Sequence, residues 1–277
     1  MKKTSIGNPH IASPYVVWSA IFIVVPLLMV AYYAFTDASG AFTLENVTKI
    51  IEYNFLKIFG VSILYAFIAT VITLILSYPL AYFMTKTSIS SQATLMLLVM
   101  LPMWMNLLIR TYSLSNILER NGIINTFLDS LGLEKLQLIN TPGAVILGMV
   151  YNFIPYMILP IYSILSKLDT RLLEASSDLG ANGFTTLRRV IIPLSMPGVV
   201  SGITMVFVPS VSTFYISQKL GGIRNELIGD VIEQQFKLNS IYNLGASLSL
   251  VLMIMIIISL AIMNKFTSED NDGGVLV

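Results

Sequence analysis

The segment EASSDLGANGFTTLRRVIIPLSMPG, residues 174–198, lies between two long apolar stretches of the chain. Around its start, apolar residues recur at roughly helical spacing among charged ones, which predicts an amphipathic helix that cannot itself span a membrane. Gly180 and Gly183 then interrupt the pattern. Because glycine adopts positive φ without a Cβ clash, this run predicts a sharp turn between two short helices. Two arginines follow, and Pro193 and Pro197 mark where apolar sequence resumes, so the segment predicts a charged docking surface outside the membrane.

The composition shows the medium in which the chain lies. Hydrophobic residues make up 55% of the sequence and charged residues only 11%, whereas soluble domains have about a quarter charged residues. Uncharged runs each supply the ~20 residues that a helix needs to cross a bilayer, and only a helix satisfies every backbone group within one segment. The expected fold is therefore an all-α polytopic membrane protein. Six spans are predicted near residues 14–35, 59–84, 91–109, 142–166, 197–217 and 243–263, in a single domain over residues 1–277, with a loop at 167–196.

The segment after residue 173 resembles the EAA signature of binding-protein-dependent ABC importer permeases. That signature is Glu-Ala-Ala, three residues, Gly, nine residues, then Ile-x-Leu-Pro. Here Glu174, Ala175 and Ser176 precede Gly180, and Pro193 closes the motif; serine replaces the third alanine, valine replaces isoleucine and isoleucine replaces leucine. The resemblance implies a type I ABC importer permease fold, with these five residues in a cytoplasmic loop that couples to an ATPase. The alternative is an amphipathic loop that packs only on its own bundle.

Other segments, at residues 77–82, 101–112 and 209–229, are similar to spermidine/putrescine permeases. This likeness implies a permease subunit that translocates polyamines in an ATP-driven importer; a related importer for iron, an opine or a phosphonate is the alternative. It also implies the partners: a second permease subunit in a heterodimer, two ATPase subunits and an extracytoplasmic substrate-binding protein.

The chain lacks the Gly-x-x-x-x-Gly-Lys-Ser/Thr phosphate loop. ATP and Mg are therefore expected to be used by partner subunits, with no cofactor bound by this chain. His10 is the sole histidine, and no multi-carboxylate cluster lies at membrane depth, so no metal site is predicted. No acid pair or nucleophile–base couple lies within the spans, which argues against an enzyme. A channel or scaffold would leave the docking loop unexplained.

Charge alone does not orient the chain, since its 16 Lys and Arg residues divide evenly between the two sides. The paired Lys2 and Lys3 ahead of the first span, together with the EAA resemblance, favour cytoplasmic termini. The first apolar stretch is too long for the core of a signal peptide. The expected location is the bacterial cytoplasmic (inner) membrane, crossed several times.

Polar and aromatic residues among apolar neighbours are candidates for a translocation pathway. Asn106 either faces a cavity or satisfies a broken helix near Pro102, and Arg110 is interpreted as an interfacial anchor that snorkels rather than as a gate. Two prolines after residues 151–153 predict an interrupted fourth span, which either lines a cavity or is kinked for packing. The pathway candidates are Asn106, Tyr151, Asn152, Ser212 and Tyr215; for Tyr215 the alternative is an interfacial tyrosine.

Three acids and two glycines complete the candidates. Glu226, Asp230 and Glu233 have i, i+4, i+7 spacing and would form one acidic face of a helix in an outer loop, to attract a polycation, grip a binding protein or simply be solvated. Gly198 and Gly202 form a small-xxx-small pattern that predicts close helix packing rather than chemistry.

Overall fold

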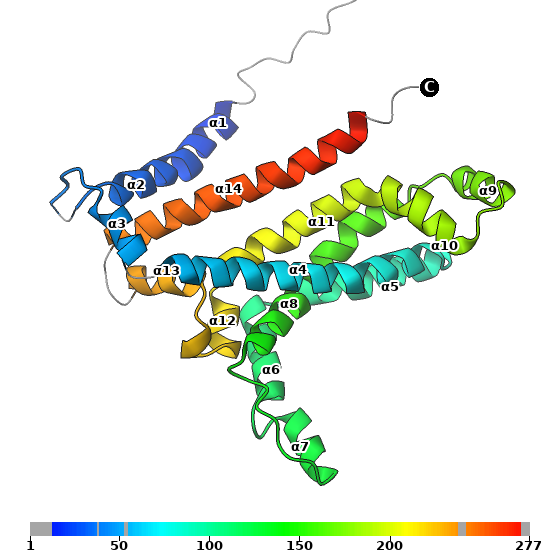
Figure 1. Cartoon of the computed structure of the whole chain (residues 1–277), viewed down its shortest axis with the longest axis horizontal. Helices are drawn as coiled ribbons and strands as arrows, with labels where there is room; N and C mark the ends of the chain where they lie inside the picture. Colours follow the sequence, from blue (N-terminus) through cyan, green and yellow to red (C-terminus); the bar gives the residue numbers. More distant parts are fainter. Residues whose placement is uncertain (1–12, 38, 53–54, 238–241, 273–277) are drawn as a thin grey trace, which may run out of the picture. The chain divides into compact units, whose positions relative to one another are not determined.

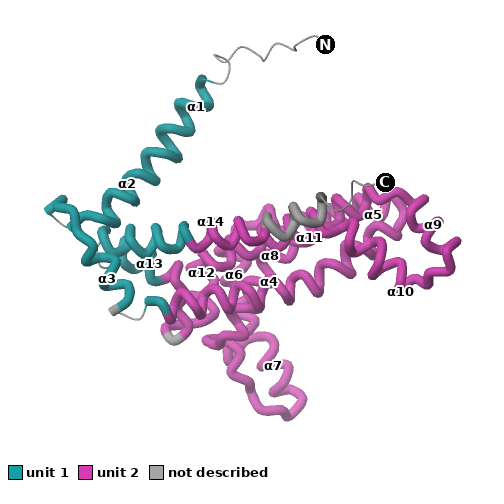
Figure 2. The backbone as a smooth tube through the Cα atoms, turned by 45° about the horizontal axis from the view of Figure 1, so that its top comes forward, with its two compact units in different colours: residues 1–56, 231–254 teal, residues 57–230, 255–277 magenta. Residues whose placement is uncertain are grey.

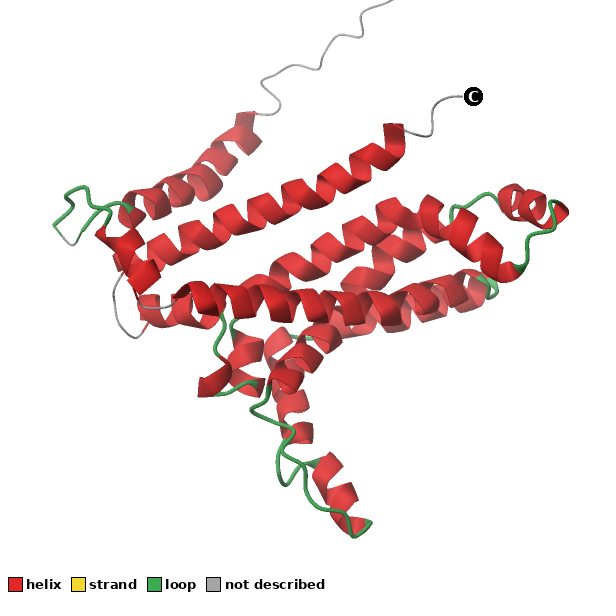
Figure 3. Cartoon of the chain, in the orientation of Figure 1, coloured by secondary structure: helices red, strands yellow, loops and turns green. Residues whose placement is uncertain are grey.

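The computed structural model describes residues 13–37, 39–52, 55–237 and 242–272, and every regular element in these ranges is a helix (Figures 1 and 3). His10 and the Lys2–Lys3 pair lie outside them. Five helical stretches are long and apolar enough to cross a membrane, and a bent pair supplies a sixth. The predicted all-α polytopic class is confirmed. The stretches are Ser13–Ala34, Phe55–Thr85, Pro142–Leu165, Gly183–Ser212 and Tyr242–Met263, and the bent pair is Ile89–Trp104 with Leu107–Ser130.

The chain divides into two compact units, drawn in different colours in Figure 2. The first comprises residues 1–56 and 231–254. It contains the first span, built from α1 (Ser13–Ser19), η2 (Ala20–Val24) and α2 (Val25–Ala34), followed by α3 (Glu45–Glu52), the second part of α13 (Ile228–Lys237) and the first part of α14 (Tyr242–Asp272).

Hydrogen bonds from α14 hold the end of the first span within this unit. The Asn243 amide donates to the carbonyl of Thr36 at 2.7 Å, and the Ser247 hydroxyl donates to that of Ala34 at 2.8 Å. The last carbonyls of a helix have no partner within the helix and need one from elsewhere. Ser247 therefore supplies a partner to the last residue of α2, and Asn243 binds the carbonyl two residues beyond it.

The second unit comprises residues 57–230 and 255–277. Figure 1 shows its long helices lying lengthwise, with α9 and α10 at the opposite end from α12, and with α6 and α7 extending away from the long helices. Its elements are α4 (Phe55–Thr85), α5 (Ile89–Trp104), α6 (Leu107–Leu118), α7 (Ile123–Ser130), α8 (Pro142–Leu165), α9 (Thr170–Asp178), α10 (Gly183–Thr186), η3 (Leu187–Ile191), α11 (Ile192–Ser212), α12 (Tyr215–Leu220), η4 (Ile223–Asn225), the start of α13 and the end of α14.

The close contact between α8 and α11 forms the centre of this unit. A Cβ on Gly198 would lie 2.8 Å from the carbonyl oxygen of Pro160, and one on Gly202 would lie 2.6 Å from the sulfur of Met157. Because such distances leave no room for a side chain, the helices approach backbone to backbone, as small residues allow in membranes. The packing role predicted for the two glycines is confirmed.

The predicted third span, residues 91–109, is wrong in its course. α5 ends at Trp104, Met105 is extended, and the chain turns through 92° into α6 and α7. The Asn106 side chain accepts a hydrogen bond from the backbone N–H of Leu108 at 2.7 Å and so caps α6. Asparagine at this position starts a new helix because its oxygen replaces a missing intrahelical acceptor. The sequence did not predict this break because apolar residues continue on both sides of it.

The fourth and fifth spans also differ from the prediction. α8 runs unbroken with Pro155 and Pro160 inside it, so the expected interruption is absent from this helix. The fifth helical stretch begins at Gly183, well before the predicted residue 197, and ends at Ser212 rather than 217. Proline removes one hydrogen bond from a helix, and the surrounding packing holds these helices together despite that loss.

Candidate functional site

The predicted docking loop folds as two helices around a tight turn. The Asp169 carboxylate accepts from the backbone N–H of Arg171 at 2.9 Å and caps α9. The Asn182 side chain caps α10 through the N–H of Thr185, also at 2.9 Å. Each cap satisfies a donor that a helix start would leave without a partner. The local sequence therefore determines where both helices begin.

Gly180 makes the turn possible. Its φ is +79°, and the neighbouring N–H groups of Gly180 and Ala181 donate to the carbonyls of Ser177 at 2.9 Å and Ser176 at 3.1 Å. A residue with a Cβ is strained at positive φ, which explains the glycine. Gly183 does not share this conformation; it begins α10. The predicted bend is thus confirmed at Gly180 alone.

A hydroxyl pair joins the two sides of the turn. The side-chain oxygens of Ser176 and Thr186 lie 3.0 Å apart, and both residues are buried. Ser176 stands where the EAA signature has its third alanine. An alanine there could not make this bond. Sequence spacing contained no signal that would have paired Thr186 with it.

The outward surface of the loop combines charge with exposed apolar side chains. Glu174, Ala175 and Pro193 are exposed, Leu179 is 89% exposed and Phe184 is 71% exposed. Large apolar side chains beside charged ones are typical of a surface that a protein partner covers. This geometry supports docking rather than a loop packed only on its own bundle.

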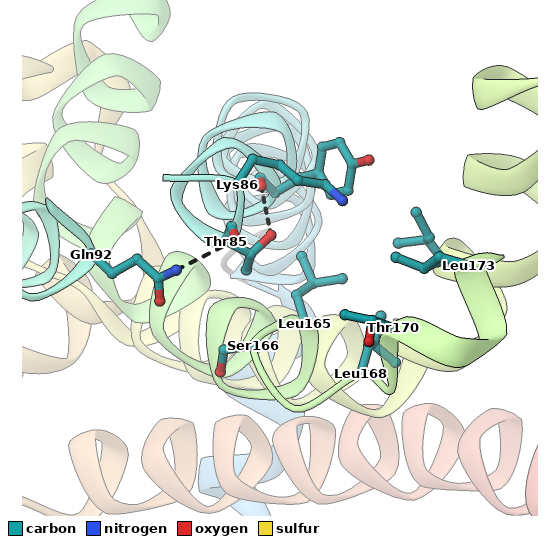
Figure 4. A pocket seen from close by; sticks show the side chains of 10 residues that line it. Thr85, Lys86, Gln92, Leu165, Ser166, Leu168, Thr170 and Leu173 are labelled. Atoms are coloured by element: carbon teal, nitrogen blue, oxygen red, sulfur yellow. Dashed lines mark hydrogen bonds between the residues drawn. The ribbon is translucent and has the colours of Figure 1, made fainter. Parts of the chain in front are cut away.

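A cavity of about 130 Å³ separates α9 from the ends of α4, α5 and α8 (Figure 4). On one wall the Gln92 amide donates to the carbonyl of Thr87 at 3.0 Å and accepts from the hydroxyl of Tyr162 at 2.8 Å. Lys86 lies 5.2 Å from the ring centroid of Tyr82. Polar side chains thus tie α5 to α8 beside the loop, while the cavity leaves space beneath α9.

The pathway candidates do not share one environment. Asn106 is exposed and caps α6, so the structure favours the broken-helix interpretation. Tyr151 is 41% exposed, while Asn152 is completely buried. Ser212 ends α11 and donates to the carbonyl of Val208 at 3.1 Å, and the half-buried Tyr215 begins α12 across the break. Only Asn152 joins a buried polar cluster.

That cluster contains Arg110, for which the anchor interpretation is wrong. A snorkelling arginine keeps its guanidinium in water, but Arg110 is only 4% exposed and reaches the backbone carbonyl of Asn152 at 3.5 Å. The Asn152 amide donates to the carbonyl of Gly148 at 2.9 Å and to the hydroxyl of Thr111 at 3.2 Å. The sequence placed Arg110 at the end of a straight span, and the bend at Asn106 brings it onto α8 instead.

The single acidic face is also wrong. Asp230 is completely buried, and its carboxylate accepts from the N–H of Leu227 at 2.7 Å, as the third residue of a capping box does. Glu226 lies before α13 begins, and Glu233 binds Lys237 at 2.5 Å. One of the three acids is therefore part of the helix start and cannot face solvent. Across the described ranges, no group of three potential metal ligands comes together.

Comparison with protein families places most of the chain in one of them. Residues 76–267 match the family model described as "Binding-protein-dependent transport system inner membrane component". The match begins near the end of α4 and continues into α14, so it includes the turn at Gly180 and the α8–α11 contact.

Individual relatives and solved structures agree with this match. The Escherichia coli (strain K12) protein named "Spermidine/putrescine transport system permease protein PotB" is 39% identical over 86% of this chain and 90% of its own. The Salmonella typhimurium (strain SL1344) protein of the same name is 37% identical over 98% of this chain and 100% of its own. A bacterial ABC transporter involved in importing the acidic polysaccharide alginate shares the fold, with a TM-score of 0.80, 13% identity and coverage of 92% and 93% of the two chains.

Proposed function

The chain belongs to the family of binding-protein-dependent transport system inner membrane components, and we propose that it is the permease subunit of an ATP-driven importer of polyamines. The observation that carries this proposal is the 37% identity to a spermidine/putrescine permease over 98% of the chain. A likeness of that extent includes the spans, the bend and the docking loop together. The family consists of transport components, so the chain itself is not expected to be an enzyme.

The proposed mechanism transmits motion through the docking loop. Two ATPase subunits bind ATP and Mg in this mechanism. One of them contacts the exposed face at Glu174, Leu179 and Phe184. Rigid caps and the Ser176–Thr186 bond hold α9 and α10 together, so a push on α9 moves α10. Since α10, η3 and α11 form one helical stretch, that movement reaches the fifth span directly. A ligand shifts such an equilibrium only through different affinities for two states.

The remaining partners follow from the same assignment. A second permease subunit would complete the pathway, and an extracytoplasmic binding protein would deliver the solute. The docking loop then lies in the cytoplasm, with both termini on that side. Iron, opine and phosphonate importers remain the alternative solute classes.

Uptake tests the proposal. Cells that contain the intact complex should accumulate labelled spermidine or putrescine, and cells lacking this chain should not. If the deletion strain still takes up both polyamines but no longer takes up an anionic or metal-chelate solute, the proposed solute class is wrong. The permease assignment would still stand. A conducting channel would show ion currents in the absence of nucleotide.

A further inference from the structure

Arg110 carries a buried positive charge that the described part of the chain does not neutralise. It is 4% exposed, and no described carboxylate forms an ion pair with it. In the described structure its guanidinium makes one hydrogen bond, to the Asn152 carbonyl at 3.5 Å, and its Nε has no partner. Burying a charge is costly unless it is paired. Such a group contributes little to folding, so its presence calls for another explanation.

The contact between α6 and α8 around Arg110 is polar and loosely bonded. Besides the arginine Nε, the side-chain oxygen of Asn152 has no partner in the described structure, although the residue is completely buried. Thr111 provides one further bond at 3.2 Å. Groups of this kind can exchange protein partners for water when two helices separate, whereas an apolar contact would lose its burial.

The contact of α8 with α11 has the opposite character. There, Gly198 and Gly202 bring the α11 backbone against Pro160 and Met157, with no room for an added side chain. Close-packed interfaces resist continuous deformation. Within this unit, α8 and α11 therefore form the rigid pair, and the contact with α6 is the one suited to change.

The break between α5 and α6 lies close to Arg110 and is suited to act as a hinge. Met105 is extended between α5 and α6, and the two helices meet at 92°. Arg110 lies one turn beyond this break. A few residues at the ends of helices commonly absorb such movements.

We propose that Arg110 is a positioning residue of the transport cycle, which holds α6 on α8 in this conformation through a contact that opens when the permease changes state. This inference rests on the proposed transport function. The unneutralised charge makes the closed contact weak enough to exchange, and the guanidinium makes the closed arrangement specific. Its role is thus to set the balance between two arrangements rather than to stabilise the fold.

Replacing Arg110 separates this role from a structural one. In the intact complex, Arg110→Met should lower polyamine uptake by roughly tenfold, within the range of typical coupling effects, while the thermal midpoint of the purified complex stays equal or rises. Arg110→Lys, which keeps the charge, should recover part of the uptake. A lower midpoint for Arg110→Met, or undiminished uptake, would overturn the proposal. If the wild-type complex imports neither polyamine, the proposed solute fails instead, and ATP hydrolysis stimulated by the binding protein replaces uptake as the measure.

A cross-link tests the opening directly and does not depend on that variant folding. The chain contains no cysteine, so Thr111→Cys with Asn152→Cys introduces a single pair across the contact. Oxidation of the complex should stop transport and a reductant should restore it, while oxidant should leave the complex that contains the unsubstituted chain active. Continued transport by the cross-linked protein, or failure of the pair to cross-link, would contradict an opening contact between α6 and α8.

Discussion

The hydroxyl oxygens of Ser176 and Thr186 lie 3.0 Å apart in a buried contact that bridges the turn between α9 and α10. The turn backbone is held by its own bonds, but this is a side-chain bond that directly joins the two helices. Serine at this position therefore gives the loop a connection that the alanine of the EAA signature could not. In the proposed mechanism, motion of one helix is passed to the other through this bond.

We expect Ser176→Ala to weaken coupling. The change leaves the buried Thr186 hydroxyl without this partner, at a cost of about 1–3 kcal/mol. The measurement is the amount of solute imported per ATP hydrolysed, which should fall. Removing both hydroxyls with Ser176→Ala and Thr186→Val should be milder than the single change, because no buried group is then deprived of its partner. Equal or greater damage in the double variant would show that the bond has no such role.

Gly180→Val should uncouple transport. At a φ of +79°, a β-branched side chain strains the turn by about 1–3 kcal/mol. A Cβ there would meet nothing within 4 Å, so the effect is one of backbone conformation only. Gly180→Asn should retain most uptake because asparagine tolerates this region, and Gly183→Ala should be nearly neutral. Equal uptake by the valine and asparagine variants would refute the explanation from strain.

Reversal of an exposed charge should weaken docking without unfolding the permease. Glu174→Lys changes the outward face of α9, where the expected result is less ATPase subunit recovered with the purified permease. Glu134→Lys, an exposed reversal outside the docking loop, is the matched control. Wild-type stoichiometry and stimulated hydrolysis with Glu174→Lys would remove this residue from the contact.

The contact between α8 and α11 predicts a large difference between two glycine substitutions. Gly198→Ala places a Cβ 2.8 Å from the carbonyl oxygen of Pro160, and such overpacking typically costs about 1–3 kcal/mol. Gly60→Ala, in α4, meets nothing within 4 Å and should be neutral or stabilising by up to about 1 kcal/mol. Thermal unfolding of the two variants in detergent provides the comparison. Similar midpoints would mean that the helices separate easily at Gly198.

The sequence alone determined the features that depend on local chemistry and on the medium. Long uncharged runs required helices because lipid offers no partners to a free backbone. The glycine at position 180 predicted the turn between α9 and α10, since that turn needs a residue that tolerates positive φ. The spacing of Gly198 and Gly202 likewise predicted a close contact between helices. Each of these follows from one continuous stretch of sequence.

Only the tertiary structure decided which polar side chains are buried, and against what. Asn106 lies in a run of apolar residues that reads as one straight span; its capping bond is visible only once the chain has turned, and that turn places Arg110 on α8. Asp230 has the spacing of an exposed acid, yet it caps the start of α13 beside Ser62, whose hydroxyl accepts from the N–H of Ile228 at 2.8 Å. Burial depends on contacts between residues far apart in sequence, and periodicity along one helix contains no information about them.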